Sequence, residues 1–140
     1  QFVVENDWKP LLSTSPAIKE IFADTDMEFQ EDYNNLQRNK NVSLIDCECM
    51  IAQTGSILVS EATAGSRAAY SSADTLLILA RPSQFVAKMK DALWLMKEKY
   101  GDEQPASMTI ISGPSCSTDI ENIPVIGVYG CKQLALFLVE

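Results

Sequence analysis

The chain of 140 residues contains no histidine. Every catalytic arrangement or metal site that needs an imidazole is therefore excluded, including Ser-His-Asp and Cys-His nucleophilic centres. Basic residues are scarce as well, because 11 lysines and arginines stand against 19 aspartates and glutamates and leave a net charge of -8. Nonspecific binding of nucleic acid needs a concentrated positive surface, so we expect no nucleic-acid partner.

Long apolar runs and targeting signals are also missing. No apolar run approaches the roughly 20 residues of a membrane-spanning helix, and no secretory signal opens the chain. We therefore expect no membrane partner and a cytoplasmic protein whose four cysteines are free thiols. The chain begins with Gln1 and runs directly into the apolar segment Phe2–Val4. We expect a single domain over residues 1–140 that lacks part of its N-terminal region.

The apolar pattern predicts an α/β domain with a mixed, mainly parallel sheet and flanking helices. Ser15 and Ser83 have the character of N-caps, and Gly101 follows the longest amphipathic segment as a stop. Helices are expected over residues 17–23, 27–39 and 84–100, and strands over 2–4, 47–52, 57–59, 75–80, 108–111, 124–128 and 134–139.

Three further predictions concern how these elements connect. The small, polar residues 61–72 predict a loop, and residues 53–56 predict the turn of a hairpin. The segment 75–111 predicts a right-handed crossover between two parallel strands. Its helix carries apolar residues over a wide face, including Trp94, and we expect it to be well buried.

The most distinctive stretch follows the strand expected at 108–111. It places Gly113, Pro114 and Ser115 before a hydroxyl-rich segment that includes Thr118. Hydroxyls and backbone N–H groups crowded at a strand end would form a pocket for a carboxylate or phosphate. The competing interpretation is an ordinary capped turn before a helix, because Thr118 and Glu121 have capping-box spacing.

Other residues have two interpretations each. Asp119 and Glu121 would supply a general base or a carboxylate nucleophile, or would simply favour a helix N-terminus. Gln53, Thr54 and Gly55 would line a ligand cleft, or only form a hairpin turn. Arg67 would hold a substrate anion, or would be a solvated surface cation.

The cysteines permit one more hypothesis. Cys47 and Cys49 are two residues apart on an expected strand, so they would face the same side. With Cys116 and Cys131 they would complete a four-thiolate zinc or iron–sulfur site, although no Cys-x-x-Cys spacing is present. Cys116 is also a candidate reactive thiol in a turn whose N–H groups would lower its pKa.

Three motifs together resemble the LUD-domain family, the LutC/YkgG-type lactate utilization proteins. They are Gln53-Thr54-Gly55-Ser56, Gly113-Pro114-Ser115 with Asp119-Ile120-Glu121, and Gly127-Val128-Tyr129-Gly130 before an apolar strand. Their order and spacing agree with the family pattern from about Leu36 to the C-terminus. The resemblance implies a fold like the NagB/RpiA/CoA-transferase superfamily, and the sheets of such folds often pair, which favours a homodimer.

The resemblance also implies a function. It is a role in oxidising L-lactate to pyruvate, as an accessory subunit without its own redox cofactor, beside iron–sulfur partner subunits of the LutA/LutB type. The fold-level analogy further raises acyl or CoA transfer, with Glu121 as nucleophile.

The central motif departs from the family pattern where recognition chemistry would be expected. Cys116 stands where the family has arginine, Tyr129 where it has histidine, Cys131 where it has proline, and Gln53 where it commonly has glutamate. A thiol cannot replace an arginine–carboxylate contact. The alternative function is therefore a catalytically degenerate module for a small organic anion or a CoA- or nucleotide-like ligand. The candidate site residues are Gln53, Thr54, Gly55, Arg67, Gly113, Pro114, Ser115, Cys116, Thr118, Asp119, Glu121, Gly127, Tyr129 and Gly130.

Overall fold

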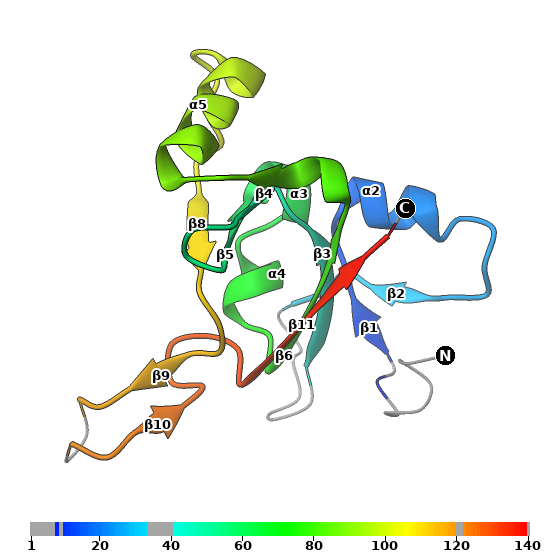
Figure 1. The fold of residues 1–140 in the computed structure, drawn as a ribbon. Helices are drawn as coiled ribbons and strands as arrows, with labels where there is room; N and C mark the ends of the chain where they lie inside the picture. Colours follow the sequence, from blue (N-terminus) through cyan, green and yellow to red (C-terminus); the bar gives the residue numbers. More distant parts are fainter. Residues whose placement is uncertain (1–7, 9, 34–40, 120–121, 140) are drawn as a thin grey trace.

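A computed structural model of the chain describes residues 8, 10–33, 41–119 and 122–139. Its centre is a five-stranded sheet in which all neighbouring strands are parallel. The strand order is β11-β6-β3-β1-β2 (Figure 1). The strands are β1 (Leu11–Leu12), β2 (Phe29–Gln30), β3 (Val42–Asp46), β6 (Thr75–Ala80) and β11 (Gln133–Leu138). The predicted α/β class with a mainly parallel sheet is confirmed.

The order of these five strands reverses once. Counted along the chain it reads 2-1-3-4-5, so the connections that follow β1 and β3 leave in opposite directions. In open α/β sheets, ligands bind outside the carboxyl ends of the strands, near such a reversal. The residues directly after β1, β3 and β6 therefore lie at the edge where a ligand would be expected.

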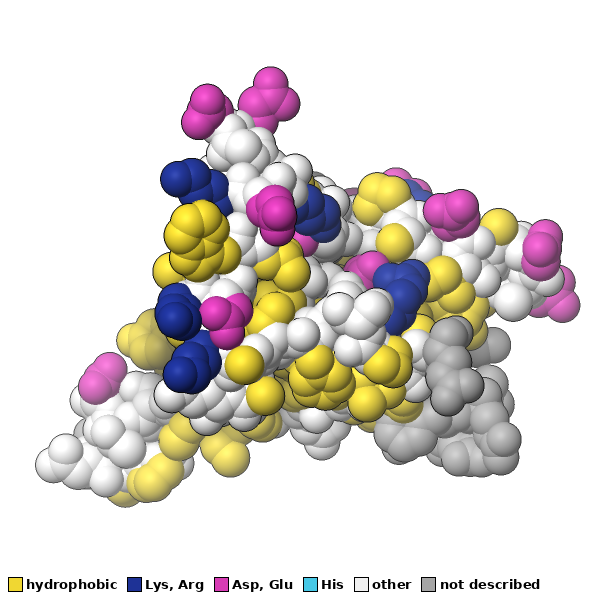
Figure 2. Space-filling model, turned by 45° about the horizontal axis from the view of Figure 1, so that its top comes forward, with side chains coloured by type: hydrophobic (Ala, Val, Ile, Leu, Met, Phe, Trp, Pro, Cys, Tyr) yellow, Lys and Arg dark blue, Asp and Glu magenta, His cyan; other side chains and the backbone are white. Residues whose placement is uncertain are grey.

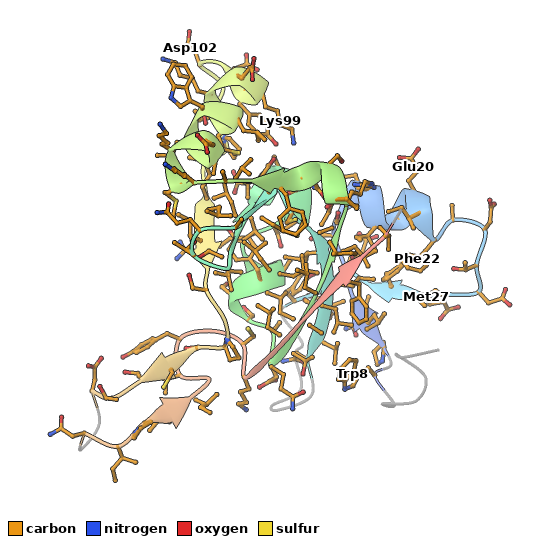
Figure 3. The ribbon with its side chains drawn as sticks, in the orientation of Figure 1. Trp8, Glu20, Phe22, Met27, Lys99 and Asp102 are labelled. Atoms are coloured by element: carbon orange, nitrogen blue, oxygen red, sulfur yellow. The ribbon has the colours of Figure 1, made fainter. Side chains whose placement is uncertain are left out.

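Both faces of the parallel sheet are covered. On one face Ile18 of α2 (Pro16–Ile21) joins a core cluster with Leu11, Leu44 and Leu77. Figure 3 shows Phe22 and Met27 in the segment between α2 and β2, and both pack against this cluster. On the other face, α3 (Glu61–Ala64) and α4 (Ala68–Ser71) pack with residues of a second sheet.

The second sheet has the order β7-β4-β5-β8 and is mixed. Its strands are β4 (Cys49–Ile51), β5 (Ser56–Ser60), β7 (Phe85–Val86) and β8 (Met108–Ile111). A 3-10 turn, η1 (Pro82–Gln84), leads from β6 into β7. The long helix α5 (Met89–Tyr100) covers one face of this sheet with Ala92 and Met96. Beyond β8 the chain forms a separate hairpin of β9 (Cys116–Ser117) and β10 (Val125–Ile126), which projects from the body in Figure 1.

Several local predictions are confirmed. The strand predicted at 75–80 is β6, and all six of its residues are buried. The hairpin around residues 53–56 is β4 paired with β5 in antiparallel register. Helix α2 begins after Ser15, although the Ser15 side chain makes no capping hydrogen bond. Gly101 ends α5 with a φ of 58°. The strand predicted at 2–4 lies outside the described residues.

Two segments were predicted wrongly from local composition. The helix predicted over 27–39 is wrong where the structure describes it, because Phe29 pairs with Leu11 and places β2 in the parallel sheet. The loop predicted over 61–72 is wrong, because α3 and α4 form there. Ser60 caps α3 by accepting a hydrogen bond from the Thr63 N–H, and small alanines let both helices approach the sheet closely.

The predicted crossover between parallel strands is also wrong. Strand β8 does not return to β6, because it pairs antiparallel with β5 in the second sheet. Helix α5 begins at Met89 rather than at Gln84, and Ser83 does not cap it. The prediction of a well-buried helix fails for its outer side, where Trp94 is 69% exposed.

The strand expected over 47–52 is confirmed at its centre and is shorter than expected, because β4 spans only Cys49–Ile51. Cys47 precedes the strand and packs in the core cluster of the parallel sheet. Cys49 lies in β4 and packs in the cluster under α5. The predicted shared face of these two thiols is therefore wrong. Within the described ranges, no helix is long and apolar enough to cross a membrane.

Candidate functional site

The Gly-Pro-Ser motif forms a turn that is fixed by backbone hydrogen bonds around Ser115. The Ser115 N–H donates to the Cys131 carbonyl at 2.8 Å, and the Ser115 carbonyl accepts from the Gly127 N–H at 2.9 Å. The Ser115 Oγ accepts from the Tyr129 N–H at 3.2 Å. Ser115 thus connects the Gly-Pro-Ser motif to the segment 127–131, which lies 12 to 16 residues further along the chain.

Glycines are required where this turn is tightest. Gly127 has a φ of 82°, and a Cβ there would overlap the side chain of Lys132. A Cβ on Gly130 would lie 3.4 Å from the Ser115 Cβ, an ordinary contact, so the available space does not require glycine there. Gly113 has a φ of 114°, which L-residues rarely adopt. Gly113 and Gly127 therefore maintain the backbone path of the motif.

The hairpin turn at residues 53–56 lies beside this motif. Ser56 begins β5, Ser112 directly follows β8, and their hydroxyl oxygens are 2.7 Å apart. Gln53, Thr54 and Gly55 are exposed at the tip of the turn. The structure thus places two motifs that are far apart in sequence at the same edge of the second sheet.

The side chains of the central motif face solvent. Cys116 and Tyr129 are exposed, and Tyr129 is 78% exposed. Thr118 and Asp119 are exposed as well, and the Asp119 N–H donates to the Ser117 Oγ rather than to a helix cap. No helix begins at Thr118 in the part of the motif that is described, since β9 and β10 form a hairpin there. Glu121 lies outside the described residues.

Arg67 is not part of this arrangement. It is exposed at the N-terminus of α4, where its carbonyl accepts from the Ser71 N–H. The hydrogen bonds of Ser115 described above join it to Cys131, Gly127 and Tyr129, and none of them involves Arg67. The prediction that Arg67 belongs to the same site as the Gly-Pro-Ser turn is therefore not supported by any hydrogen bond among the described residues.

The four cysteines do not converge on a metal position. Among the described residues, no group of three or more acidic or thiol side chains is placed to hold a metal ion. Burial, with the neighbouring charge of Asp46, raises the pKa of Cys47 to about 12. Burial and the charge of Glu48 raise the pKa of Cys49 to about 11, and burial raises the pKa of Cys131. Cys116 is the exposed thiol.

A second group of polar residues lies at the carboxyl ends of β3 and β6, where sequence reasoning did not place a site. Asp46 ends β3 and is 6% exposed, and its Oδ1 accepts from the Cys47 N–H at 2.7 Å. Arg81 follows β6, and its guanidinium NH1 is 3.4 Å from the Asp46 Oδ2. Gln84 donates to the Cys47 carbonyl at 2.6 Å and accepts from the Arg81 N–H.

Arg81 is therefore a cation oriented by a buried carboxylate at the edge of the parallel sheet where a ligand would be expected. Its side chain is 43% exposed, so the guanidinium has donors that face solvent. The sequence signal is an acid that ends one buried strand, Asp46 in β3, and an arginine that directly follows another, Arg81 after β6. It was missed because β3 was not recognised as a separate strand.

A neighbouring network surrounds Glu48, whose side chain is fully buried. Glu48 accepts hydrogen bonds from Lys99 at 2.8 Å, Tyr100 at 2.7 Å and Ser60 at 2.5 Å. Burial alone lowers the pKa of Lys99, but the hydrogen bond and charge of Glu48 outweigh it and raise the pKa. Figure 3 shows Lys99 near the end of α5, so this network anchors the last turn of α5 to the sheet.

The fold and motifs define an α/β protein with a parallel sheet and a Gly-Pro-Ser turn, and comparison with known proteins assigns the family. The LUD domain model matches residues 9–139, so the chain belongs to the LUD domain family. The chain is 29% identical over 110 residues to Lactate utilization protein C of Bacillus licheniformis, covering 76% of this chain and 46% of that protein.

Two further comparisons agree. The chain is 28% identical over 102 residues to the uncharacterized protein YkgG of Escherichia coli strain K12, covering 71% of this chain and 44% of that protein. A crystal structure of a DUF162 family protein from Deinococcus radiodurans matches with a TM-score of 0.59 and 17% identity, over 93% of this chain and 86% of that chain. The chain spans less than half the length of the curated relatives it matches.

Proposed function

We propose that this domain is a cytoplasmic accessory subunit of a lactate-oxidising system, and that it binds a small carboxylate of the lactate or pyruvate class without a redox cofactor of its own. The family membership and the relative named Lactate utilization protein C support the lactate connection. The electron-transferring partners would be iron–sulfur subunits.

The observation that carries the ligand-binding part is the Arg81–Asp46 pair. A guanidinium recognises a carboxylate through two parallel N–H donors, and its geometry is most specific when the side chain is held in place. Asp46 is buried and engages NH1 of Arg81, which leaves the remaining donors for a ligand. In the central motif Cys116 stands at the position after Ser115, and the cation beside Gly127, Lys132, is paired with Asp74 at 2.9 Å.

Calorimetry with lactate and pyruvate tests the ligand-binding part. Arg81→Gln should abolish binding, whereas Lys90→Gln, which removes an exposed cation on α5, should bind like the unchanged chain. Equal binding by the Arg81→Gln variant would reject the site. Silence of the unchanged chain toward both acids would reject carboxylate binding.

Co-purification from the native cell tests the accessory role separately. A tagged chain should recover iron–sulfur proteins, and the Arg81→Gln variant should recover them equally if docking and ligand binding use different surfaces. Recovery of no iron–sulfur or oxidoreductase protein would count against the accessory role, whatever the calorimetry shows.

The alternative is a catalytically degenerate module for a CoA- or nucleotide-like ligand. The exposed Cys116 and Tyr129, which replace the family's arginine and histidine, favour it. Binding of CoA esters or nucleotides, with no response to lactate or pyruvate, would support this alternative over the first proposal.

A further inference from the structure

The outer side of α5 exposes large apolar side chains. Trp94 is 69% exposed and Leu93 is 55% exposed, whereas Ala92 and Met96 on the inner side are 0% and 2% exposed. Figure 2 shows this hydrophobic surface, with basic groups above and below it and acidic groups nearby. Large apolar side chains exposed together on one helix are typical of surfaces that take part in protein–protein contacts.

Basic and acidic residues of α5 lie on opposite sides of Trp94. An α-helix turns 100° per residue, so residues seven apart lie on nearly the same line along the helix. Lys90 and Lys97 form one such line, and Asp91 and Glu98 form another. The two lines flank Trp94 on opposite sides, about 40–60° away from it in each direction. The Lys97 Nζ lies 5.9 Å from the Trp94 ring centroid, which agrees with this placement.

We propose that α5 pairs with α5 of a second copy of this chain, in parallel and about a two-fold axis that runs along the helices. Trp94 of each copy then packs at the axis. This symmetry places the lysine line of one helix against the acidic line of the other. Lys97 meets Glu98 of the second copy and Lys90 meets its Asp91, because each pair differs by a single 1.5 Å step along the helix.

The same pattern argues against an antiparallel pair. An antiparallel two-fold arrangement would place the lysine line of one helix against the lysine line of the other, and the acidic line against the acidic line. Like charges across an interface oppose association. The charge pattern is therefore self-complementary in the parallel arrangement and repulsive in the antiparallel one.

The overall charge of the chain also favours this surface for self-association. The chain carries a net charge of -8, so two copies repel each other over most of their surfaces. Residues 81–100 reverse this sign locally, since they contain five lysines and arginines and two acidic residues. Two copies that approach through α5 avoid most of the acidic surface.

Sedimentation velocity on the full 140-residue chain, over a wide range of protein concentration, tests the proposal. The unchanged chain should dimerise. Trp94→Ala and Lys97→Glu should each weaken the dimer about tenfold or more, the second because a carboxylate would then face Glu98 of the second copy. The exchange variant Lys97→Glu with Glu98→Lys restores opposite charges and should restore the dimer. Lys19→Glu on α2 makes the same change in net charge and should leave the dimer unchanged.

Helical circular dichroism and the unfolding midpoint of each variant show whether it has folded, so a folded variant that is monomeric reports on the interface alone. A chain that stays monomeric at all concentrations overturns the proposal, even if it binds another protein. A dimer that Lys97→Glu strengthens also overturns it, because that response belongs to the antiparallel arrangement. Failure of the exchange variant to recover the dimer would reject the pairing of Lys97 with Glu98.

Discussion

Removal of Lys99 should destabilise the protein strongly by leaving a buried charge without its counter-ion. Lys99→Met deletes the ammonium group 2.8 Å from Glu48, whose side chain is fully buried. Breaking a buried ion pair from one side typically costs about 3–5 kcal/mol. Tyr100 and Ser60 still donate to Glu48, and Lys99 itself is 47% exposed, so the lower end of the range applies. We expect a loss of about 3 kcal/mol in the free energy of unfolding at pH 8.

The cost should depend on the charge of Glu48. Glu48→Gln removes the charge and keeps a side chain that accepts hydrogen bonds from Ser60 and Tyr100. The double variant Glu48→Gln with Lys99→Met should therefore recover about 2 kcal/mol relative to Lys99→Met alone.

Urea unfolding of the single and double variants at pH 8 measures these differences. Lys88→Met, which removes an exposed lysine whose backbone alone bonds to Asp91, is the matched control and should change stability by less than about 0.5 kcal/mol. The reasoning would be refuted if the double variant were as unstable as Lys99→Met, because the loss would then come from packing rather than from the buried charge.

Three further predictions follow from buried thiols and strained glycines. Because the pKa values of Cys47 and Cys49 are raised, the native state keeps protons on these thiols that the unfolded chain releases as the pH rises. The free energy of unfolding should therefore fall by about 5 kcal/mol between pH 8 and pH 11. Chemical denaturation across this pH range measures the fall, and a free energy of unfolding that does not change with pH contradicts the prediction. A thiol reagent at pH 7 should label Cys116 rapidly and the buried thiols only in denaturant, and rapid labelling of a second site would show that the core opens. Gly65→Ala should lower the free energy of unfolding by about 3 kcal/mol or more, because the φ of Gly65 is 81° and a Cβ would overlap the backbone of the chain after β1. Gly55→Ala, with open space around the new Cβ, should lower it by only about 1 kcal/mol. Thermal unfolding of both variants measures the difference.

The sequence predicted the elements whose signals are local. The apolar run 75–80 is a strand buried on both faces, and a continuous apolar segment of that length is typical of such strands. The hairpin at residues 53–56 and the end of α5 at Gly101 follow from turn and capping chemistry that acts within a few residues. The motif pattern also predicted the family, which the LUD domain model confirms.

The candidate site was predictable only in part. The glycines and Ser115 were singled out by their spacing, and the structure joins them through the backbone bonds of Ser115. Arg81 and Asp46 were not singled out, because their significance depends on β3 and β6 being neighbours in the sheet. Arg67 was selected as a lone cation in an expected loop, but α4 places it at a helix start.

By itself, the sequence determined the class of fold, the family, the lack of histidine in these 140 residues and the tight turn around Gly113, Pro114 and Ser115. These depend on composition, on short-range periodicity and on the conformational freedom of individual residues. The tertiary structure alone decided that β8 joins the second sheet, that β2 replaces a predicted helix, and that Arg81 meets Asp46. Strand pairing and the burial of one charge beside another are set by which segments meet in space, and no local pattern of residues encodes that.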